Sequence, residues 1–143
     1  MAGNKEVSGE KLNMKTVMAQ GVFDLLHPGH LHYLRNSCEK GDKLVVVIAR
    51  DSRIDKELYF KENERREMIE ALEAVDEALL GSEDSIYDTV RKVDPDVITL
   101  GYDQPFDEKE VAEMASEATG NEVDVIRIDE RPEYSSTHIR EKT

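Results

Sequence analysis

Residues 21–30 read GVFDLLHPGH and combine residue types suited to phosphate chemistry. His27 and His30 are three positions apart, so on a helix their imidazoles lie on one face of the same turn. Pro28 suits the first position of a helix, and Gly29 leaves room above the helix N-terminus. The free amides and the dipole of such a terminus favour a phosphate. Two imidazoles beside it can donate hydrogen bonds to phosphoryl oxygens as charge builds in a transition state.

The two histidines also have simpler interpretations. Either histidine alone is most simply a helix-start residue with local hydrogen bonds. A metal site on His27 and His30 needs a further ligand, which the sequence does not place. His32 has the wrong helical phase to join the pair and is expected on the surface. The whole stretch, placed at the end of a strand, favours a site that holds and activates a polyphosphate.

The pattern of apolar residues predicts the elements that position this stretch. A strand is expected at 16–20 and a helix at 30–39, on either side of the motif. Further strands are expected at 43–49, 78–80, 96–100 and 123–128, and further helices at 63–74, 84–93, 107–119 and 136–141. Alternating strands and helices indicate parallel βαβ units with right-handed crossovers. The predicted fold class is α/β, a Rossmann-like doubly wound five-stranded parallel sheet with flanking helices, which binds ligands at the carboxyl ends of its strands.

Two details of these helices are also predicted. In the helix at 63–74, Met68, Ile69 and Leu72 are expected to face inward and the charged residues outward. Gly120 follows the helix at 107–119 in the usual place for a left-handed cap.

Composition limits the classes of function. The 143 residues include 32 acidic and 19 basic side chains, for a net charge of −13 spread along the chain. Such a surface repels nucleic acid and anionic membranes. It favours a halophilic source with a salty cytoplasm, and the simpler alternative is an ordinary acidic soluble protein. Cys38 is the only cysteine, which excludes an intrachain disulfide and a cysteine-based zinc site.

No long apolar run or signal peptide is visible, so a cytoplasmic protein is expected. We expect a disordered tail at 1–14 and one domain at 15–143.

The motif GVFDLLHPGH resembles the GxFDxxHxGH signature of the nucleotidyltransferase superfamily, whose members transfer AMP or CMP from a nucleoside triphosphate. The resemblance extends from Val17 to Arg140. Within the superfamily the chain is most similar to the archaeal FAD synthases, in the stretches VVVIARDS at 45–52, RREMIEAL at 65–72, VDEALLGS at 75–82 and PDVITLGYDQ at 95–104. The resemblance implies ATP and FMN as substrates, with a divalent cation, magnesium, carried by the triphosphate and no metal cage built by the protein.

The resemblance also implies roles for single residues. Val22 and Phe23 would line the nucleotide site, and His27 and His30 would contact the triphosphate and stabilise the transition state. Other positions implied to bind the nucleotide are Pro28, Gly29, Asp103, Ser136, Thr137 and Arg140. Two simpler alternatives stay open: Asp103 as an ordinary turn aspartate, and the segment at 135–140 as a capped helix start with a surface arginine.

The chain departs from the family in the loop after its second strand. Relatives carry a lysine-rich loop with a proline there, whereas residues 53–61 read RIDKELYFK, without proline or glycine. Lys56 is the candidate phosphate-binding lysine, with Arg53 and Lys61 as alternatives. The chain also lacks the cysteines that some archaeal relatives carry near the C-terminus.

Three functions are compatible with these residues. The favoured one is an FAD synthase, an FMN adenylyltransferase that releases pyrophosphate. The second is a cytidylyltransferase acting on glycerol 3-phosphate or a similar phosphorylated alcohol, because RPEYSST at 131–137 shares part of the RTEGISTT signature of those enzymes. The third is a nucleotide-binding regulatory module without turnover, although binding alone does not require both histidines. Whether two copies form a homodimer is left open.

Overall fold

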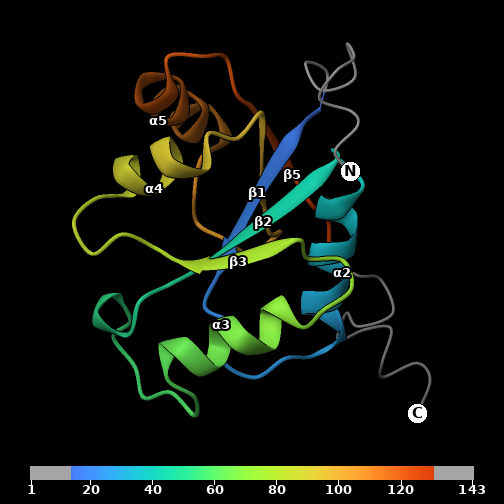
Figure 1. Cartoon of the computed structure of the whole chain (residues 1–143), viewed down its shortest axis with the longest axis vertical. Coiled ribbons are helices and arrows are strands. Elements are labelled where there is room, and N and C mark those ends of the chain that lie inside the picture. Colours follow the sequence, from blue (N-terminus) through green and yellow to red (C-terminus); the bar gives the residue numbers. More distant parts are fainter. Residues whose placement is uncertain (1–13, 131–143) are drawn as a thin grey trace.

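The computed structural model describes residues 14–130 of the chain, which form a parallel sheet with helices on both faces (Figure 1). The sheet has five strands in the order β3-β2-β1-β4-β5, and every neighbouring pair is parallel. The strands are β1 (Thr16–Gly21), β2 (Lys43–Ile48), β3 (Glu77–Leu80), β4 (Val97–Leu100) and β5 (Asp124–Arg127). The predicted Rossmann-like doubly wound fold is therefore confirmed.

The helices divide into two layers. They are α2 (Pro28–Cys38), α3 (Glu62–Glu70), α4 (Ile86–Val93) and α5 (Glu108–Thr119), and a short 3-10 helix, η2, spans Asp51–Arg53. Figure 1 shows α2 and α3 on one face of the sheet and α4 and α5 on the other. The chain fills one side of β1 with β2 and β3 and then returns to β4 on the other side. The junction between β1 and β4 is thus the point where the strand order reverses, which is where such sheets bind ligands.

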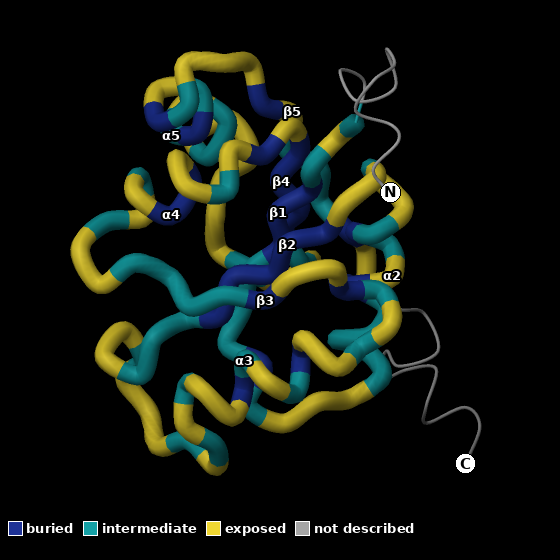
Figure 2. The backbone as a smooth tube through the Cα atoms, in the orientation of Figure 1, coloured by how far each residue is buried: buried dark blue, intermediate teal, exposed yellow. Residues whose placement is uncertain are grey.

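Two hydrophobic cores fix these layers. Successive side chains of a strand point to opposite faces. In β1, Val17 and Ala19 join the core beneath α2 and α3, whereas Met18 joins the core beneath α4 and α5. Figure 2 shows the central strands buried and the exposed residues concentrated on the helices and loops around them. The apolar residues of the central strands thus form the interior, and most acidic residues remain exposed to water on the helices and loops.

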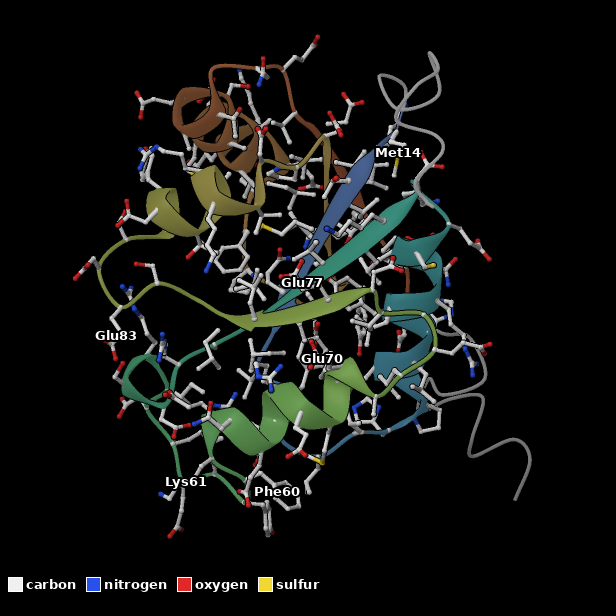
Figure 3. The ribbon with its side chains drawn as sticks, viewed as in Figure 1. Met14, Phe60, Lys61, Glu70, Glu77 and Glu83 are labelled. Carbon is white, nitrogen blue, oxygen red and sulfur yellow. The ribbon has the colours of Figure 1, made fainter. Side chains whose placement is uncertain are left out.

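Several predicted boundaries and faces are corrected by the structure. Helix α2 begins at Pro28, two residues earlier than expected. Helix α3 ends at Glu70 (labelled in Figure 3) and not at Ala74, because the chain then makes tight turns and the Asp76 amide donates to the Leu44 carbonyl at 3.0 Å to start β3. The charges of α3 do not all face outward, since Arg65 is fully buried.

The amino ends of the strands are closed by aspartate side chains. Asp42 accepts from the Lys15 amide at 2.8 Å, Asp96 from the Thr16 amide at 2.9 Å, and Asp76 from the Leu44 amide at 2.7 Å. At the same edge Gly120 ends α5 in the left-handed conformation that the sequence predicted. These contacts satisfy backbone amides that the sheet itself leaves without a partner.

Some predictions fall outside the described residues. The final helix at 136–141, with Ser136, Thr137 and Arg140, lies there, as does the tail expected at 1–14 apart from Met14. Between residues 14 and 130, no helix has the length and apolar character needed to cross a membrane.

Candidate active site

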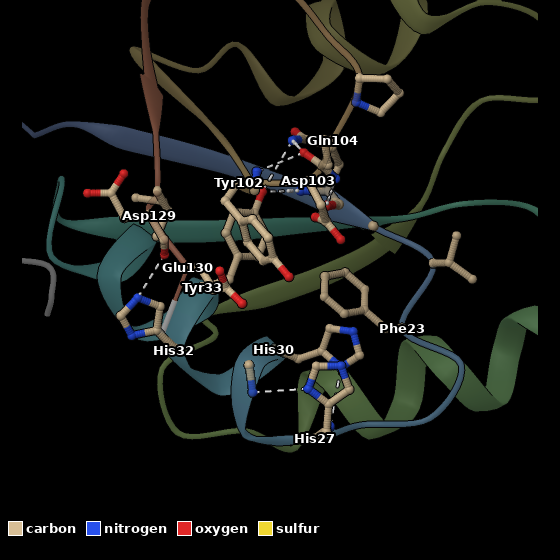
Figure 4. A pocket seen from close by; sticks show the side chains of 17 residues that line it. Phe23, His27, His30, His32, Tyr33, Tyr102, Asp103, Gln104, Asp129 and Glu130 are labelled. Carbon is tan, nitrogen blue, oxygen red and sulfur yellow. Dashed lines mark hydrogen bonds between the residues drawn. The ribbon is translucent and has the colours of Figure 1, made fainter. Parts of the chain in front are cut away.

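A pocket of about 350 Å³ opens at the carboxyl ends of β1 and β4 (Figure 4). Residues 20–23 line it from the end of β1, residues 101–105 from the end of β4, and the first turns of α2 from below. Figure 4 shows Phe23, His27 and His30 together on one side and the turn at 102–104 facing them. The pocket lies where the strand order reverses, as expected for a ligand site in this fold.

His27 and His30 are brought together as the sequence predicted. His27 is the N-cap of α2, and its Nδ1 accepts a hydrogen bond from the Gly29 amide at 3.0 Å. The Nδ1 of His30 accepts in turn from the His27 amide at 3.2 Å, and the two rings stack with centroids 3.9 Å apart. A nitrogen that accepts a hydrogen bond carries no proton in a neutral imidazole, so each ring holds its proton on Nε2. The capping bonds thus leave one outward donor on each histidine.

Two glycines make this packing possible. A Cβ on Gly29 would come within 2.7 Å of the His27 ring, and a Cβ on Gly21 within 2.7 Å of the Phe23 ring. Phe23 has φ 54°, in the left-handed region that bulky side chains rarely adopt. Its buried ring meets His30 edge to face, with centroids 5.5 Å apart. Val22 and Phe23, which the resemblance implies at the nucleotide site, both line this pocket, and the Phe23 ring packs against His30.

The surroundings of His30 keep its imidazole neutral. Burial lowers the pKa of His30 to about 4, and the neighbouring His27 acts in the same direction, while Asp103 opposes both. At neutral pH the ring therefore acts as a hydrogen-bond donor without a formal charge. This agrees with a role in binding developing negative charge through Nε2–H.

Arg65 is a site-forming residue that the sequence reasoning missed. Its fully buried guanidinium donates to the Val22 carbonyl at 2.7 Å, to the Phe60 carbonyl at 3.1 Å and to the Asp51 carboxylate at 2.6 Å. It thus joins the loop after β1 to the loop after β2. A signal was present, because Arg65 precedes the inward-facing Ile69 by one helical turn and so shares its face.

A polar network forms the floor of the pocket and was also not predicted. The Gln20 amide nitrogen donates to the Thr99 carbonyl at 2.6 Å, and the Tyr33 hydroxyl donates to the same oxygen at 2.8 Å. Burial raises the pKa of Tyr33 to about 12, so its hydroxyl stays protonated. Gln104 bridges the two strand ends by donating to the Gln20 carbonyl at 3.1 Å and accepting from Gly101. Within residues 14–130, the Gln20 side-chain oxygen is buried without a hydrogen-bond partner.

His32 corrects an expectation. It is half-buried and lines the pocket, and its Nε2 lies 3.0 Å from the Asp129 carbonyl oxygen. The helical phase does separate it from His27 and His30. However, residues 128–130, which follow β5, lie beside the face of α2 that carries His32, and this face therefore forms part of the pocket wall. The periodicity of a single helix cannot predict this contact.

Of the charged residues predicted to bind the nucleotide or its phosphates, some line the pocket and others do not. Asp103 is exposed and lines the pocket, as expected for the end of β4. Lys56 is exposed in the loop after η2 and does not line the pocket, and Arg53 donates to the Glu83 carbonyl at 2.9 Å. Among the described residues the pocket lining contains no lysine or arginine but does contain Asp103, Asp129 and Glu130. A polyphosphate here therefore needs cations from other parts of the chain or from an ion that it carries.

The described residues do not fit a metal ion held by the protein. Between residues 14 and 130, no group of three or more histidine, cysteine or acidic side chains is arranged to hold one. We therefore assign no step to a protein-held ion.

The cytidylyltransferase-like family model matches residues 18–142. The chain belongs to the cytidylyltransferase-like family. Within this family it is 45% identical over 134 residues to an FAD synthase of Methanocella paludicola, covering 90% of this chain and 96% of that protein. It is 50% identical over 118 residues to an FAD synthase of Aciduliprofundum boonei, covering 80% and 78%.

A solved structure is also similar over most of the chain. The protein from Thermoplasma volcanium, described as a lipopolysaccharide core biosynthesis protein, superposes with a TM-score of 0.78 at 49% identity. The superposition covers 82% of this chain and 98% of that structure. The identity to the FAD synthases of Methanocella paludicola and Aciduliprofundum boonei confirms the sequence-based resemblance to archaeal FAD synthases.

Proposed function

We propose that the protein is an FAD synthase, which transfers AMP from ATP to FMN and releases pyrophosphate. The observation that carries this conclusion is the similarity to FAD synthases over nearly the whole chain, including 45% identity across 96% of one of them. The position of the pocket at the strand ends and the two imidazoles in its lining support this proposal. The reaction also explains why both histidines are present, since binding of a nucleotide alone does not require two outward donors.

The transfer breaks one bond and forms one. A phosphate oxygen of FMN attacks the α-phosphorus of ATP, and the bond from that phosphorus to the bridging oxygen of the β-phosphate breaks. Pyrophosphate leaves with the bonding electrons. The FMN phosphate is already an anion at neutral pH, so no base is required. Catalysis then depends on positioning and on stabilising charge at the phosphoryl oxygens.

His27 and His30 are the proposed donors to those oxygens. Their Nδ1 atoms are occupied by backbone amides, so the rings are held in place and present Nε2–H outward. A preorganised donor does not need to reorient when charge develops, which is the source of its catalytic advantage. We assign Val22, Phe23, Gly29 and Asp103 to nucleotide binding because they line the same pocket. The family motifs also assign Pro28 at the start of α2, Ser136, Thr137 and Arg140 to nucleotide binding. Lys56 is the proposed phosphate-binding lysine, in a loop that departs from the family pattern.

A divalent cation, magnesium, is proposed to arrive with ATP. The acidic pocket wall and the lack of a metal-binding cluster among residues 14–130 are both compatible with an ion carried by the substrate. Such an ion offsets the charge of the triphosphate and so lowers its repulsion from Asp103, Asp129 and Glu130.

One assay tests the proposed function against the cytidylyltransferase alternative. The full chain is incubated with MgCl₂ and each pairing of ATP or CTP with FMN or glycerol 3-phosphate, and FAD and pyrophosphate are measured. We expect FAD and an equal amount of pyrophosphate only from ATP with FMN. Turnover of CTP with glycerol 3-phosphate, without FAD formation from ATP and FMN, would contradict the proposal. Nucleotide binding without any turnover would instead indicate a regulatory module.

A further inference from the structure

The large apolar side chains that are exposed share one edge of the sheet. Within residues 14–130, all of them lie in loops or first helical turns that follow the carboxyl end of a strand: Leu25, Leu26, Tyr59, Ile86, Tyr102 and Phe106. Tyr102 lines the nucleotide pocket, between β1 and β4. Leu25, Leu26 and Tyr59 lie instead in the loops after β1 and β2, and we call these three residues the apolar ledge.

The ledge is assembled by specific hydrogen bonds. The Asp24 carboxylate accepts from the Tyr59 amide at 3.0 Å and from the Phe60 amide at 3.0 Å. Arg65 reinforces the same junction by bonding the carbonyls of Val22 and Phe60. Two loops that are far apart in sequence are thereby held together. The three apolar side chains nevertheless remain exposed, at 52% for Leu25, 36% for Leu26 and 77% for Tyr59.

The position of the ledge relative to the histidines suggests its occupant. Leu26 directly precedes His27, so the ledge begins where the histidine pair begins. The nucleotide pocket extends from that pair toward β4, and the ledge extends from it toward β2. In a transfer between two bound molecules, the acceptor has to reach the α-phosphate from outside the space that the nucleotide fills.

We infer that the apolar ledge binds the isoalloxazine ring of the acceptor FMN, an inference that rests on the proposed function. A flat aromatic ring can stack on Tyr59 and cover the two leucines, which removes apolar surface from water on both partners. Lys56, three residues before Tyr59, is exposed and close enough to Asp24 to act on that carboxylate electrostatically. The ledge therefore combines an apolar surface with a nearby positive charge, which matches a phosphorylated aromatic acceptor.

Steady-state kinetics of Tyr59→Ala test this inference. The KM for FMN is expected to rise about three- to tenfold, which corresponds to the loss of one aromatic stacking contact. The KM for ATP and kcat are expected to stay within about twofold, because Tyr59 does not line the nucleotide pocket. Tyr59→Phe keeps the ring and is expected to retain the wild-type KM for FMN. Ile86→Ala is the matched control, since Ile86 is 48% exposed at the start of α4.

The outcomes separate this inference from the proposed function. If wild-type protein forms FAD and Tyr59→Ala keeps the wild-type KM for FMN, the ledge inference is overturned while the proposed function stands. The same holds if Tyr59→Ala changes only the oligomeric state in analytical ultracentrifugation, because the occupant would then be a second copy of the chain. If wild-type protein forms no FAD from ATP and FMN, the proposed function fails and the ledge inference fails with it.

Discussion

The two edges of the sheet are built differently. At the amino edge, Asp42, Asp76 and Asp96 close the first amides of the strands, and no large apolar side chain in the described part of the chain is exposed there. At the carboxyl edge, Phe23 adopts a left-handed conformation and the Gln20 side-chain oxygen is buried without a partner among residues 14–130. The left-handed residue of the amino edge is Asp94, a residue type that tolerates this conformation at the end of a helix, whereas Phe23 is bulky. The carboxyl edge thus combines a bulky left-handed residue, a buried oxygen without a partner and exposed apolar groups.

This difference indicates that the carboxyl edge binds ligands and that the amino edge mainly stabilises the sheet. Backbone strain and unpaired buried atoms each cost stability, so they persist where the surrounding structure determines them and where a ligand can use them. The loops at the carboxyl edge are held together by a few internal contacts, chiefly those of Arg65 and Asp24. Substitutions of residues that line the pocket should therefore change activity. Substitutions of residues that hold the loops together, such as Arg65, or that close the amino edge, such as Asp76, should change stability.

Replacing His30 by alanine is expected to have the largest effect on activity. Loss of one preorganised donor typically lowers kcat about 100- to 1000-fold, or about 3–4 kcal/mol. The KM for ATP should change much less, because the donor acts mainly on charge that develops during transfer. Initial rates over a range of ATP concentrations give both values. A variant with near-normal kcat would remove the main reason for treating the carboxyl edge as catalytic.

Arg65→Met is expected to be the most destabilising single substitution considered. It leaves the carbonyls of Val22 and Phe60 and the Asp51 carboxylate without their donor, a loss of about 2–4 kcal/mol in the free energy of unfolding. Urea unfolding measures it. Arg66→Met is the matched control, because the half-exposed ion pair of Arg66 with Glu70 contributes only about 0.5 kcal/mol. Equal effects of the two substitutions would show that Arg65 does not hold the loops together.

Arg65 also shows where sequence reasoning ended. The run KLVVVIA at 43–49 predicted β2 well, because a strand buried on both faces has little alternative. The histidine pair was predicted because its spacing is local to one helical turn. Arg65, His32 and Gln20 were not predicted, since their partners come from segments distant in sequence. The halophilic source and the cytoplasmic location stay predictions, because no contact between residues 14 and 130 tests them.

The pH dependence of stability should report the burial of His30. Its pKa is about 4 in the folded chain and 6.5 in the reference state, so the unfolded chain binds more protons between these values. Stability is therefore expected to fall as the pH decreases from 6.5 to 4. The effect is reduced by solvent screening, since the side chain is only half-buried. Urea unfolding of wild-type protein and His30→Asn across this range should show a steeper loss for wild type; parallel curves would contradict the assigned burial.

The smallest expected effect lies at the amino edge. Asp76→Ala removes the acceptor of the Leu44 amide, which is expected to cost about 1–2 kcal/mol of unfolding free energy. Its kcat should match that of wild type, because Asp76 lies at the opposite end of the strands from the histidines. Thermal unfolding and initial rates measured on the same preparation provide both numbers. A large loss of kcat in Asp76→Ala without a loss of stability would contradict the proposal that the amino edge acts on stability and not on catalysis.

The most direct test of the donor role compares kcat for His27→Asn and His27→Gln. The oxygen of asparagine can replace Nδ1 as the acceptor for the Gly29 amide and so preserve the helix cap, but it leaves nothing in the place of Nε2. The glutamine amide nitrogen can occupy the place of Nε2 while the cap is lost. We predict that His27→Asn folds with wild-type stability but loses about 100-fold or more in kcat, whereas His27→Gln retains more activity at lower stability. Wild-type kcat in His27→Asn would contradict the account.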